Sequence, residues 1–437
     1  MLTRSLVLAW LAATPLAPLA PLAAQQLTAA ERAAAVATIW AEARYNFAYW
    51  DRVRADWDSA LTANLKLAPE PQSDLLFCRR LRRLVALLGD GQSAVIPPPA
   101  VRSRIARPPL LLASVERRPF LLDYAENDEM RVARPERLGE ILAVQGMPAD
   151  AWLRDSVLPE ISAATAADRW QRAVTWMLQG EKGTTLQLLL RVPGGGERGV
   201  SVTRSVSLND RWPLEPAAFA VESLPGRVVI VRLNSLSDAD EVRRFDRAFA
   251  DFGGVQGLVV DLRRAAGGGG RTELGYQILG RLAGKPFVAA RWKTPEHRAV
   301  FRAWNETDSA TTWYAPPADT VRPRGAAPAY GGPIAVLAGT ATAGAAEDFL
   351  AAFRAAGRGV IVGEPSAGSP GDVAAFPLPK GWTVQFSVSH HAAPDGTEFA
   401  GTGIKPDLPV APTVRDVLAG ADPALDRAKA YVSGKRP

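Results

Sequence analysis

Hydroxyl side chains that could attack a carbonyl gather near one turn in the C-terminal half of the chain. Residues 339–347 read Gly-Thr-Ala-Thr-Ala-Gly-Ala-Ala-Glu and include Thr342. Ser366 and Ser369 lie in a later turn. A hydroxyl activated by a neighbouring base can open an acyl bond. Thr342 and Ser366 are therefore candidate nucleophiles for hydrolysis.

Such a nucleophile needs a base and a residue that orients the base, all within hydrogen-bond reach. The only histidines are His297, His390 and His391. We expect His390 and His391 to end a strand at 382–389, with side chains in opposite directions, one buried and one in solvent. One of them facing the cleft would keep hydrolysis possible. No cysteine or carboxylate has metal-ligand spacing to them, so we expect no metal or other cofactor.

The turn at 339–347 stands between an apolar strand at 334–337 and an alanine-rich helix at 345–353. Free backbone N–H groups and the positive end of the helix dipole meet at such a place. Both stabilise a developing oxyanion. We therefore expect the N–H group of Ala345 to bind a peptide carbonyl.

A second set of N–H groups is expected after the buried strand at 255–262. Asp261-Leu262-Arg263 is followed by four glycines at 267–270. Glycines let the backbone approach a ligand closely, and successive N–H groups bind anions. Gly267 and Gly268 are therefore further candidates for peptide or oxyanion binding.

The segment 220–412 alternates apolar strands with helical stretches, which predicts an α/β core with a largely parallel sheet and outer helices. The expected strands are 228–233, 255–262, 334–337 and 360–363, and the expected helices are 241–252, 272–282 and the run after Gly344. A C-terminal tail or helix follows at 413–437.

The part before this core divides in two. Residues 27–100 are mainly helical, beginning with a capping box at Thr28 and Glu31. The only cysteine, Cys78, falls in an amphipathic helix, so no intramolecular disulfide forms. Residues 108–205 mix short strands with turns.

The segments 138–146, 183–191 and 200–203 resemble strands of a PDZ domain. PDZ-like domains bind chain termini by adding a strand to a sheet edge. The alternative is a small sheet that serves only as a spacer, and the sequence leaves both open.

Several motifs in this order resemble the tail-specific, or carboxyl-terminal processing, serine peptidases and their tricorn-core relatives. Besides the turn at 339–347 they are Leu-Gly-Asp-Gly-Gln-Ser at 88–93, Asp261-Leu262-Arg263 with its glycines, Gly363-Glu364-Pro365 with Gly368, Pro394-Asp395-Gly396, and Gly-Ile-Lys-Pro-Asp at 403–407. The resemblance implies a helical unit, a PDZ-like insert and a peptidase core. It also implies peptides or protein C-terminal segments as partners.

The catalytic positions of that family are substituted. The resemblance places the catalytic serine at Gly344, the lysine of one branch at Ser369, and the histidine and glutamate of the tricorn-like branch at Gln92 and Ala400. A glutamine cannot take a proton from a hydroxyl near neutral pH, and an alanine cannot orient a base.

Three hypotheses follow. The first is a pseudopeptidase that keeps the peptide-binding cleft and has lost hydrolysis. The second is an active serine-type peptidase with a relocated nucleophile, Thr342 or Ser366. The third is a scaffold that makes no use of the cleft.

Composition and the N-terminus limit where the protein works. The net charge of +6 is modest, and no basic run with interleaved aromatics is present, so we expect no nucleic-acid partner. Residues 1–24 resemble a signal peptide, with Arg4 before an apolar stretch and a small-residue end. Three prolines in this short segment argue against a membrane anchor. We expect export to the periplasm or the medium; the oligomeric state is not predicted.

Overall fold

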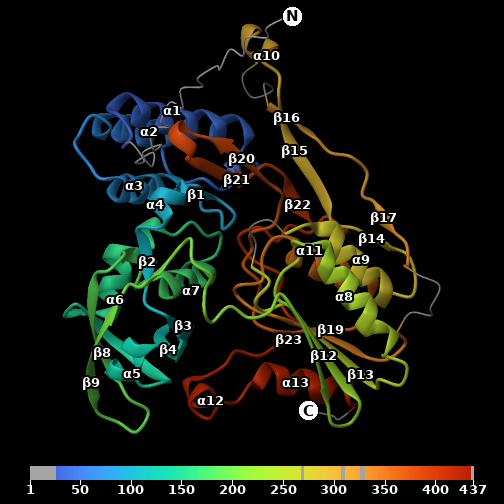
Figure 1. Ribbon diagram of the computed structural model, residues 1–437. Coiled ribbons are helices and arrows are strands. Elements are labelled where there is room, and N and C mark those ends of the chain that lie inside the picture. The colour runs from blue at the N-terminus through green and yellow to red at the C-terminus, as the bar shows by residue number, and fades with distance from the viewer. Residues whose placement is uncertain (1–25, 267–269, 307–310, 325–329, 435–437) are drawn as a thin grey trace, which may run out of the picture.

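The computed structural model describes residues 26–434 except 267–269, 307–310 and 325–329. The expected signal segment at 1–24 and the glycines Gly267 and Gly268 lie outside the described residues. Figure 1 shows N-terminal helices at the top left, a β-rich part below them, and an α/β core beside it. Among the described residues, no helix is both long and apolar enough to cross a membrane.

The core is built on a six-stranded sheet with the order β11-β12-β13-β18-β19-β23. Strand β11 runs antiparallel to β12, and every other neighbouring pair is parallel. The strands are β11 (Phe219–Leu224), β12 (Val228–Leu233), β13 (Gly257–Asp261), β18 (Ile334–Ala338), β19 (Val360–Gly363) and β23 (Leu408–Pro409). The predicted α/β core with a largely parallel sheet is confirmed.

Helices cover both faces of this sheet, because its buried strands send alternate side chains to opposite sides. On β12, Val229 and Val231 join the cluster under one group of helices, whereas Val228 and Ile230 pack toward the opposite face. The first group is α8 (Ala239–Ala250), α9 (Thr272–Leu282) and α11 (Ala345–Ala356); the opposite face carries α13 (Pro423–Val432), preceded by α12 (Val414–Leu418).

The N-terminal helices share their core with strands from the C-terminal part of the chain. Trp382 and Phe386 are buried among residues of the first helices, and the Trp382 ring lies 5.7 Å from that of Phe77. Figure 1 shows β20 and β21 beside α1. The elements are α1 (Ala29–Asn46), η1 (Trp50–Arg52), α2 (Trp57–Leu67), α3 (Asp74–Ala86), β1 (Ala94–Ile96), α4 (Pro99–Arg102), β20 (Val373–Pro377), η5 (Pro379–Gly381) and β21 (Thr383–Ser387).

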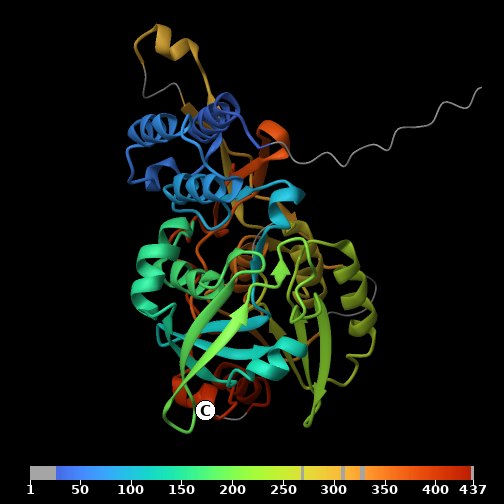
Figure 2. The same ribbon diagram turned by 60° about the vertical axis from the view of Figure 1, so that its left-hand side comes forward.

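The β-rich part has an antiparallel sheet and a hydrophobic cluster of its own. In Figure 2 its strands stand in front of the core. The elements are β2 (Ile105–Arg107), β3 (Leu110–Val115), β4 (Arg118–Tyr124), α5 (Asp128–Ala133), β5 (Gly139–Val144), β6 (Met147–Pro148), α6 (Ala149–Trp152), η2 (Leu153–Val157), η3 (Leu158–Glu160), α7 (Ala166–Trp176), β7 (Gly180–Glu181), β8 (Thr185–Arg191), β9 (Glu197–Thr203) and β10 (Val206–Ser207). Its likeness to a PDZ domain and the domain boundaries stay predictions.

The two adjacent histidines do not end the strand that the sequence suggested. Strand β21 stops at Ser387, and His390 belongs to a separate strand, β22 (His390–Ala392). The prediction was wrong because the chain leaves the β1-β21-β20 sheet there and pairs with β15 instead. The remaining elements are β14 (Phe287–Val288), β15 (Arg291–His297), α10 (Val300–Ala303), β16 (Thr311–Tyr314) and β17 (Thr320–Val321).

Candidate active site

The turn before α11 lies at the carboxyl end of β18, where ligands of open parallel sheets commonly bind. Gly344 is the N-cap of the helix and has φ 59° and ψ −126°. This conformation suits glycine, because a Cβ atom makes it costly. Gly344, where the resemblance places the catalytic serine, therefore has no hydroxyl and a backbone conformation that glycine adopts without a Cβ penalty.

The next residue, Ala345, keeps the backbone N–H group that an oxyanion site needs. Ala345 is the first residue of α11, and its N–H group donates no hydrogen bond to any residue that the structure describes. A Cβ atom built on Gly270 would lie 3.1 Å from the Cβ atom of Ala345, so the end of the glycine run passes beside this amide. The predicted donor Ala345 is thus in place and unpartnered within the described chain.

A buried carboxylate, Glu347, joins this turn to the loop after β19. Its oxygens accept hydrogen bonds from the Ser366 hydroxyl (2.6 Å) and from the N–H groups of Gly368 (2.7 Å), Ser369 (2.9 Å) and Gly344 (3.3 Å). Burial raises the pKa of Glu347 to about 8 against these hydrogen bonds. The role of Glu347 here is to hold the two turns together.

Among the described residues, neither predicted fallback nucleophile has a histidine beside it, and Ser366 contacts a carboxyl group, that of Glu347. The Thr342 hydroxyl donates to the carbonyl oxygen of Leu262 at 2.9 Å. The Ser366 hydroxyl donates to Glu347 and accepts the N–H group of Ile404 at 2.7 Å. Both side chains are buried, and neither hydroxyl contacts a histidine among the described residues. Their hydrogen bonds are those of structural hydroxyls.

The other positions to which the resemblance assigns catalytic residues lie near the same turn. Ser369 contacts it through its carbonyl oxygen, which accepts the Gly344 N–H group at 3.2 Å, and its hydroxyl accepts the Gly91 N–H group at 3.1 Å. Gln92, next along the chain, is buried and donates to the Gly371 carbonyl oxygen at 3.1 Å. Its side-chain oxygen has no hydrogen-bond partner in the described structure.

Ala400 lies among the apolar residues that pack under the N-terminal helices. Its neighbour Gly401 donates an N–H group to the Gly368 carbonyl oxygen at 2.7 Å. The site therefore collects segments from the N-terminal helices, the core and the C-terminal strands. No side chain at these four positions can serve as a nucleophile paired with a base.

Sequence reasoning missed a buried row of polar groups centred on His391. The Nδ1 atom lies 3.0 Å from both carboxylate oxygens of Asp348, and Nε2 lies 2.9 Å from the Ser389 hydroxyl oxygen and 3.4 Å from Asp372. His390 is also buried, against Tyr49. The expectation of one buried and one solvated histidine was wrong, because each ring finds a partner inside the protein.

This row has the order serine, histidine, aspartate, but its histidine is charged. Burial lowers the pKa of His391, whereas the charges and hydrogen bonds of Asp348 and Asp372 outweigh burial and raise it to about 10. The carboxylates of Asp348 and Asp372 favour the protonated imidazole, which cannot accept a proton from Ser389. The Ser389 hydroxyl oxygen also accepts the Asp372 N–H group at 2.8 Å.

The His391 row opens on a cavity of about 330 Å³ between α9 and β15. Asp372 and His391 line one side of it, and Tyr276, Trp292 and Arg324 contribute to the remainder. The signal that could have led to this row is Asp348, which directly follows Glu347 in the first turn of the expected helix.

Comparison with known proteins shows what the core of this chain is similar to. Residues 227–410 match the family model described as peptidase family S41. The core of this chain is therefore similar to peptidase family S41. The match begins just before β12 and ends just after β23, so it covers most of the core sheet. The resemblance to tail-specific serine peptidases is thereby confirmed.

Individual proteins show the same similarity. The chloroplastic C-terminal processing peptidase of Tetradesmus obliquus is 26% identical over 253 residues, which are 55% of this chain and 49% of that protein. This chain spans about half the length of that curated relative. Mature CPAF complexed with lactacystin superposes with a TM-score of 0.72 at 14% identity, covering 93% of this chain and 98% of that chain. Mature CPAF gives the same TM-score and identity, covering 97% of its chain. These structures show that the fold extends beyond the matched core.

Proposed function

We propose that this S41 protein is an exported pseudopeptidase that holds peptides or protein C-terminal segments without cleaving them. The observation that carries the proposal is the turn before α11. There, Gly344 replaces the nucleophile while the adjacent Ala345 N–H group stays unpartnered among the described residues. Export rests on the signal-like residues 1–24 alone.

The surrounding side chains support loss of hydrolysis. Gln92 occupies the family base position, and Thr342 and Ser366 donate their protons to fixed acceptors. Removing nucleophile and base from a serine triad lowers the rate by about 10⁶-fold. Oxyanion stabilisation by backbone N–H groups alone leaves little turnover.

The peptide ligand is proposed from the fold and from the relatives. The Tetradesmus protein is named as a C-terminal processing peptidase. An amide at a helix N-terminus can receive a peptide carbonyl in the same way that it stabilises an oxyanion. Peptide binding therefore needs only the groups that this turn retains.

Two measurements test the proposal. A fluorophosphonate probe should label no residue of the purified protein, and labelled peptide libraries should bind without being cleaved. Ala345→Pro removes the N–H group at the first helical position, where proline is tolerated, and should weaken peptide binding. Ala345→Gly keeps the N–H group and should bind as the wild type does. If no peptide binds, the scaffold hypothesis takes the place of this one.

The Ser389–His391–Asp348 row favours one second candidate, an active serine hydrolase with a relocated nucleophile. Its distances of 2.9 and 3.0 Å are those of a triad. This candidate predicts fluorophosphonate labelling of Ser389 that disappears in Ser389→Ala and in Asp348→Asn. Labelling with that pattern would overturn the pseudopeptidase proposal.

A further inference from the structure

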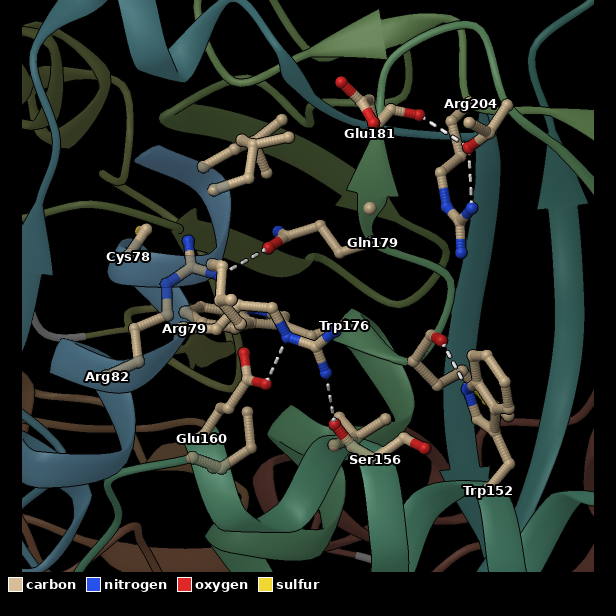
Figure 3. Close-up of a pocket in the computed structure, with 18 of the residues that line it drawn as sticks. Cys78, Arg79, Arg82, Trp152, Ser156, Glu160, Trp176, Gln179, Glu181 and Arg204 are labelled. Carbon is tan, nitrogen blue, oxygen red and sulfur yellow. Dashed lines mark hydrogen bonds and ion pairs between the residues drawn. The ribbon is translucent and has the colours of Figure 1, made fainter. Parts of the chain in front are cut away.

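A second cavity, of about 410 Å³, lies away from the candidate active site. It is bounded by α3, by the segment from α6 to η3, and by Arg204 after β9 (Figure 3). None of its lining residues takes part in the turn before α11 or in the His391 row. Its size falls within the roughly 300–1,000 Å³ typical of small-molecule sites.

The carboxylates on the wall of this cavity already have cationic partners. Glu160 accepts a hydrogen bond from Arg79 at 2.6 Å, and Arg79 also reaches the Ser156 carbonyl oxygen. Glu181 pairs with Arg104 at 3.1 Å. These two acidic groups are therefore not free to neutralise the remaining arginines.

Arg82 and Arg204 have no carboxylate partner among the described residues. Arg82 donates to the Gln179 side-chain oxygen at 3.0 Å. Arg204 donates Nε–H to the Leu178 carbonyl oxygen at 2.8 Å and Nη1–H to the Thr184 hydroxyl at 2.7 Å. Within the described structure its Nη2 group has no acceptor.

The environment of Arg204 disfavours its charge. Burial lowers the pKa of Arg204, and the neighbouring positive charge of Arg79 lowers it further. A bound anion would offset both effects, because an opposite charge stabilises the ionised guanidinium. This wall of the cavity is thus complementary to a negative group.

Aromatic and aliphatic side chains line another part of the cavity. The Arg82 guanidinium lies 5.4 Å from the centre of the Trp176 ring, which fixes its position. The Trp152 N–H group donates to the Met177 carbonyl oxygen at 2.8 Å, so its ring presents carbon atoms to the cavity. Leu76 on α3 is 43% exposed beside them.

We propose that this cavity binds a small carboxylate with an aromatic or aliphatic body. The Arg204 guanidinium, whose Nη2 group has no acceptor in the described structure, receives the carboxylate, because a planar fork of N–H donors fits carboxylate oxygens. Arg82 lies across the cavity, beyond Gln179, and adds positive charge there (Figure 3). Trp152 and Trp176 cover the body. The inference does not depend on the proposed function of the α11 turn.

Isothermal titration with matched acids and amides tests the site. The probes are 4-phenylbutyrate, indole-3-propionate and octanoate, each beside its primary amide. We expect at least one acid to bind and its amide to bind about tenfold or more weakly, since the amide cannot pair with the guanidinium groups. Arg204→Gln should weaken binding of the acid by a similar factor, and Arg82→Gln, which removes a more distant charge, should weaken it less.

Arg131→Gln is the matched control, because Arg131 is exposed and pairs only with the exposed Asp128. It should leave binding unchanged. If Arg204→Gln does not fold, as judged by circular dichroism, the charge-retaining Arg204→Lys and the comparison of acid with amide on the wild type carry the test. Equal binding of acid and amide, indifference to Arg204→Gln, or no binding of any acid at millimolar concentration overturns the inference.

Discussion

Gly344 combines a missing hydroxyl with a backbone conformation of φ 59° and ψ −126°. Replacing it with serine supplies the nucleophile but forces a Cβ atom into that conformation. Gly344→Ser should therefore lower the free energy of unfolding by roughly 1–3 kcal/mol. It should still show no fluorophosphonate labelling, because the Gln92 amide cannot take the proton.

Urea denaturation and probe labelling measure the two effects of Gly344→Ser separately. Gly344→Ala is its control, since it adds the Cβ atom without the hydroxyl and should lose similar stability. Stoichiometric labelling of the introduced serine in the Gly344→Ser variant would show that a base is present after all.

The charged state of His391 gives stability a pH dependence. Its pKa is about 10 in the folded protein and near 6.5 when unfolded. The raised folded value means that stability from this group is complete below about pH 6.5 and is lost as the pH rises to about 10, by roughly 3–5 kcal/mol.

The free energy of unfolding of the wild type should thus fall faster over this window than that of His391→Asn. Comparing the two slopes by urea denaturation removes the contribution of other groups. Parallel slopes would mean that the imidazole is neutral, and would favour the hydrolase candidate.

The sequence predicted the place of a residue well where a motif surrounds it. It predicted the place poorly where the residue's contacts come from distant parts of the chain. The turn around Gly344 could be located because strand, glycine and helix follow each other directly. The row around His391 could not, since Asp348 lies 43 residues away in the chain and carries no motif of its own. Both histidines are buried because folding supplies partners that local alternation cannot reveal.

At the level of elements, the motif Asp261-Leu262-Arg263 fixes the C-terminal helix. Arg263 pairs with Asp261 at the end of β13 and donates to both carboxylate oxygens of Asp422, the N-cap of α13, at 2.9 and 2.8 Å. A partly buried, two-pronged contact of this kind stabilises more than an exposed ion pair does.

Asp422→Asn should therefore destabilise the protein by about 1–3 kcal/mol, because it weakens charge-assisted hydrogen bonds and leaves Arg263 less well paired. Asp426→Asn, on the same helix but exposed and paired only with Lys429, should change stability by less than about 0.5 kcal/mol. Thermal or urea unfolding of both variants checks the difference, and equal losses would argue against an anchoring role for Arg263.

The positions of helices and strands along the chain were predicted better than the contacts of single residues. The helix at 272–282 and the strand at 360–363 have the predicted bounds. The element that sequence placed wrongly was β22, because pairing with β15 depends on which edge is free in three dimensions.

At the scale of the whole molecule, the β-rich part and the N-terminal helices differ in whether each forms its hydrophobic core from its own residues. The β-rich part has its own cluster, centred on residues such as Leu121 and Val174. The N-terminal helices instead depend on Trp382 and Phe386 from β21 and its vicinity. Local patterns could not predict this sharing, because nothing in the first hundred residues marks the part of their core that comes from residues 378–400.

Expressed alone, residues 108–205 should give a cooperative unfolding transition and dispersed amide signals in an NMR spectrum. Residues 26–100 should not, since they lack the strands that fill their core. If the 26–100 fragment folds, the N-terminal helices do not need β20 and β21 to form their core. In the full chain, Trp382→Ala should lower the free energy of unfolding by about 3–5 kcal/mol.

The interlocking of α1 and α3 with β21 also sets an order of events during synthesis. The first helices leave the ribosome early, but the residues that complete their core follow only after almost the whole chain has been made. Until then their apolar faces stay exposed, a state prone to aggregation and to capture by chaperones. Such distant contacts also make folding slow. A chain truncated by a stop codon before Trp382 lacks these contacts, so its N-terminal helices should remain protease-sensitive.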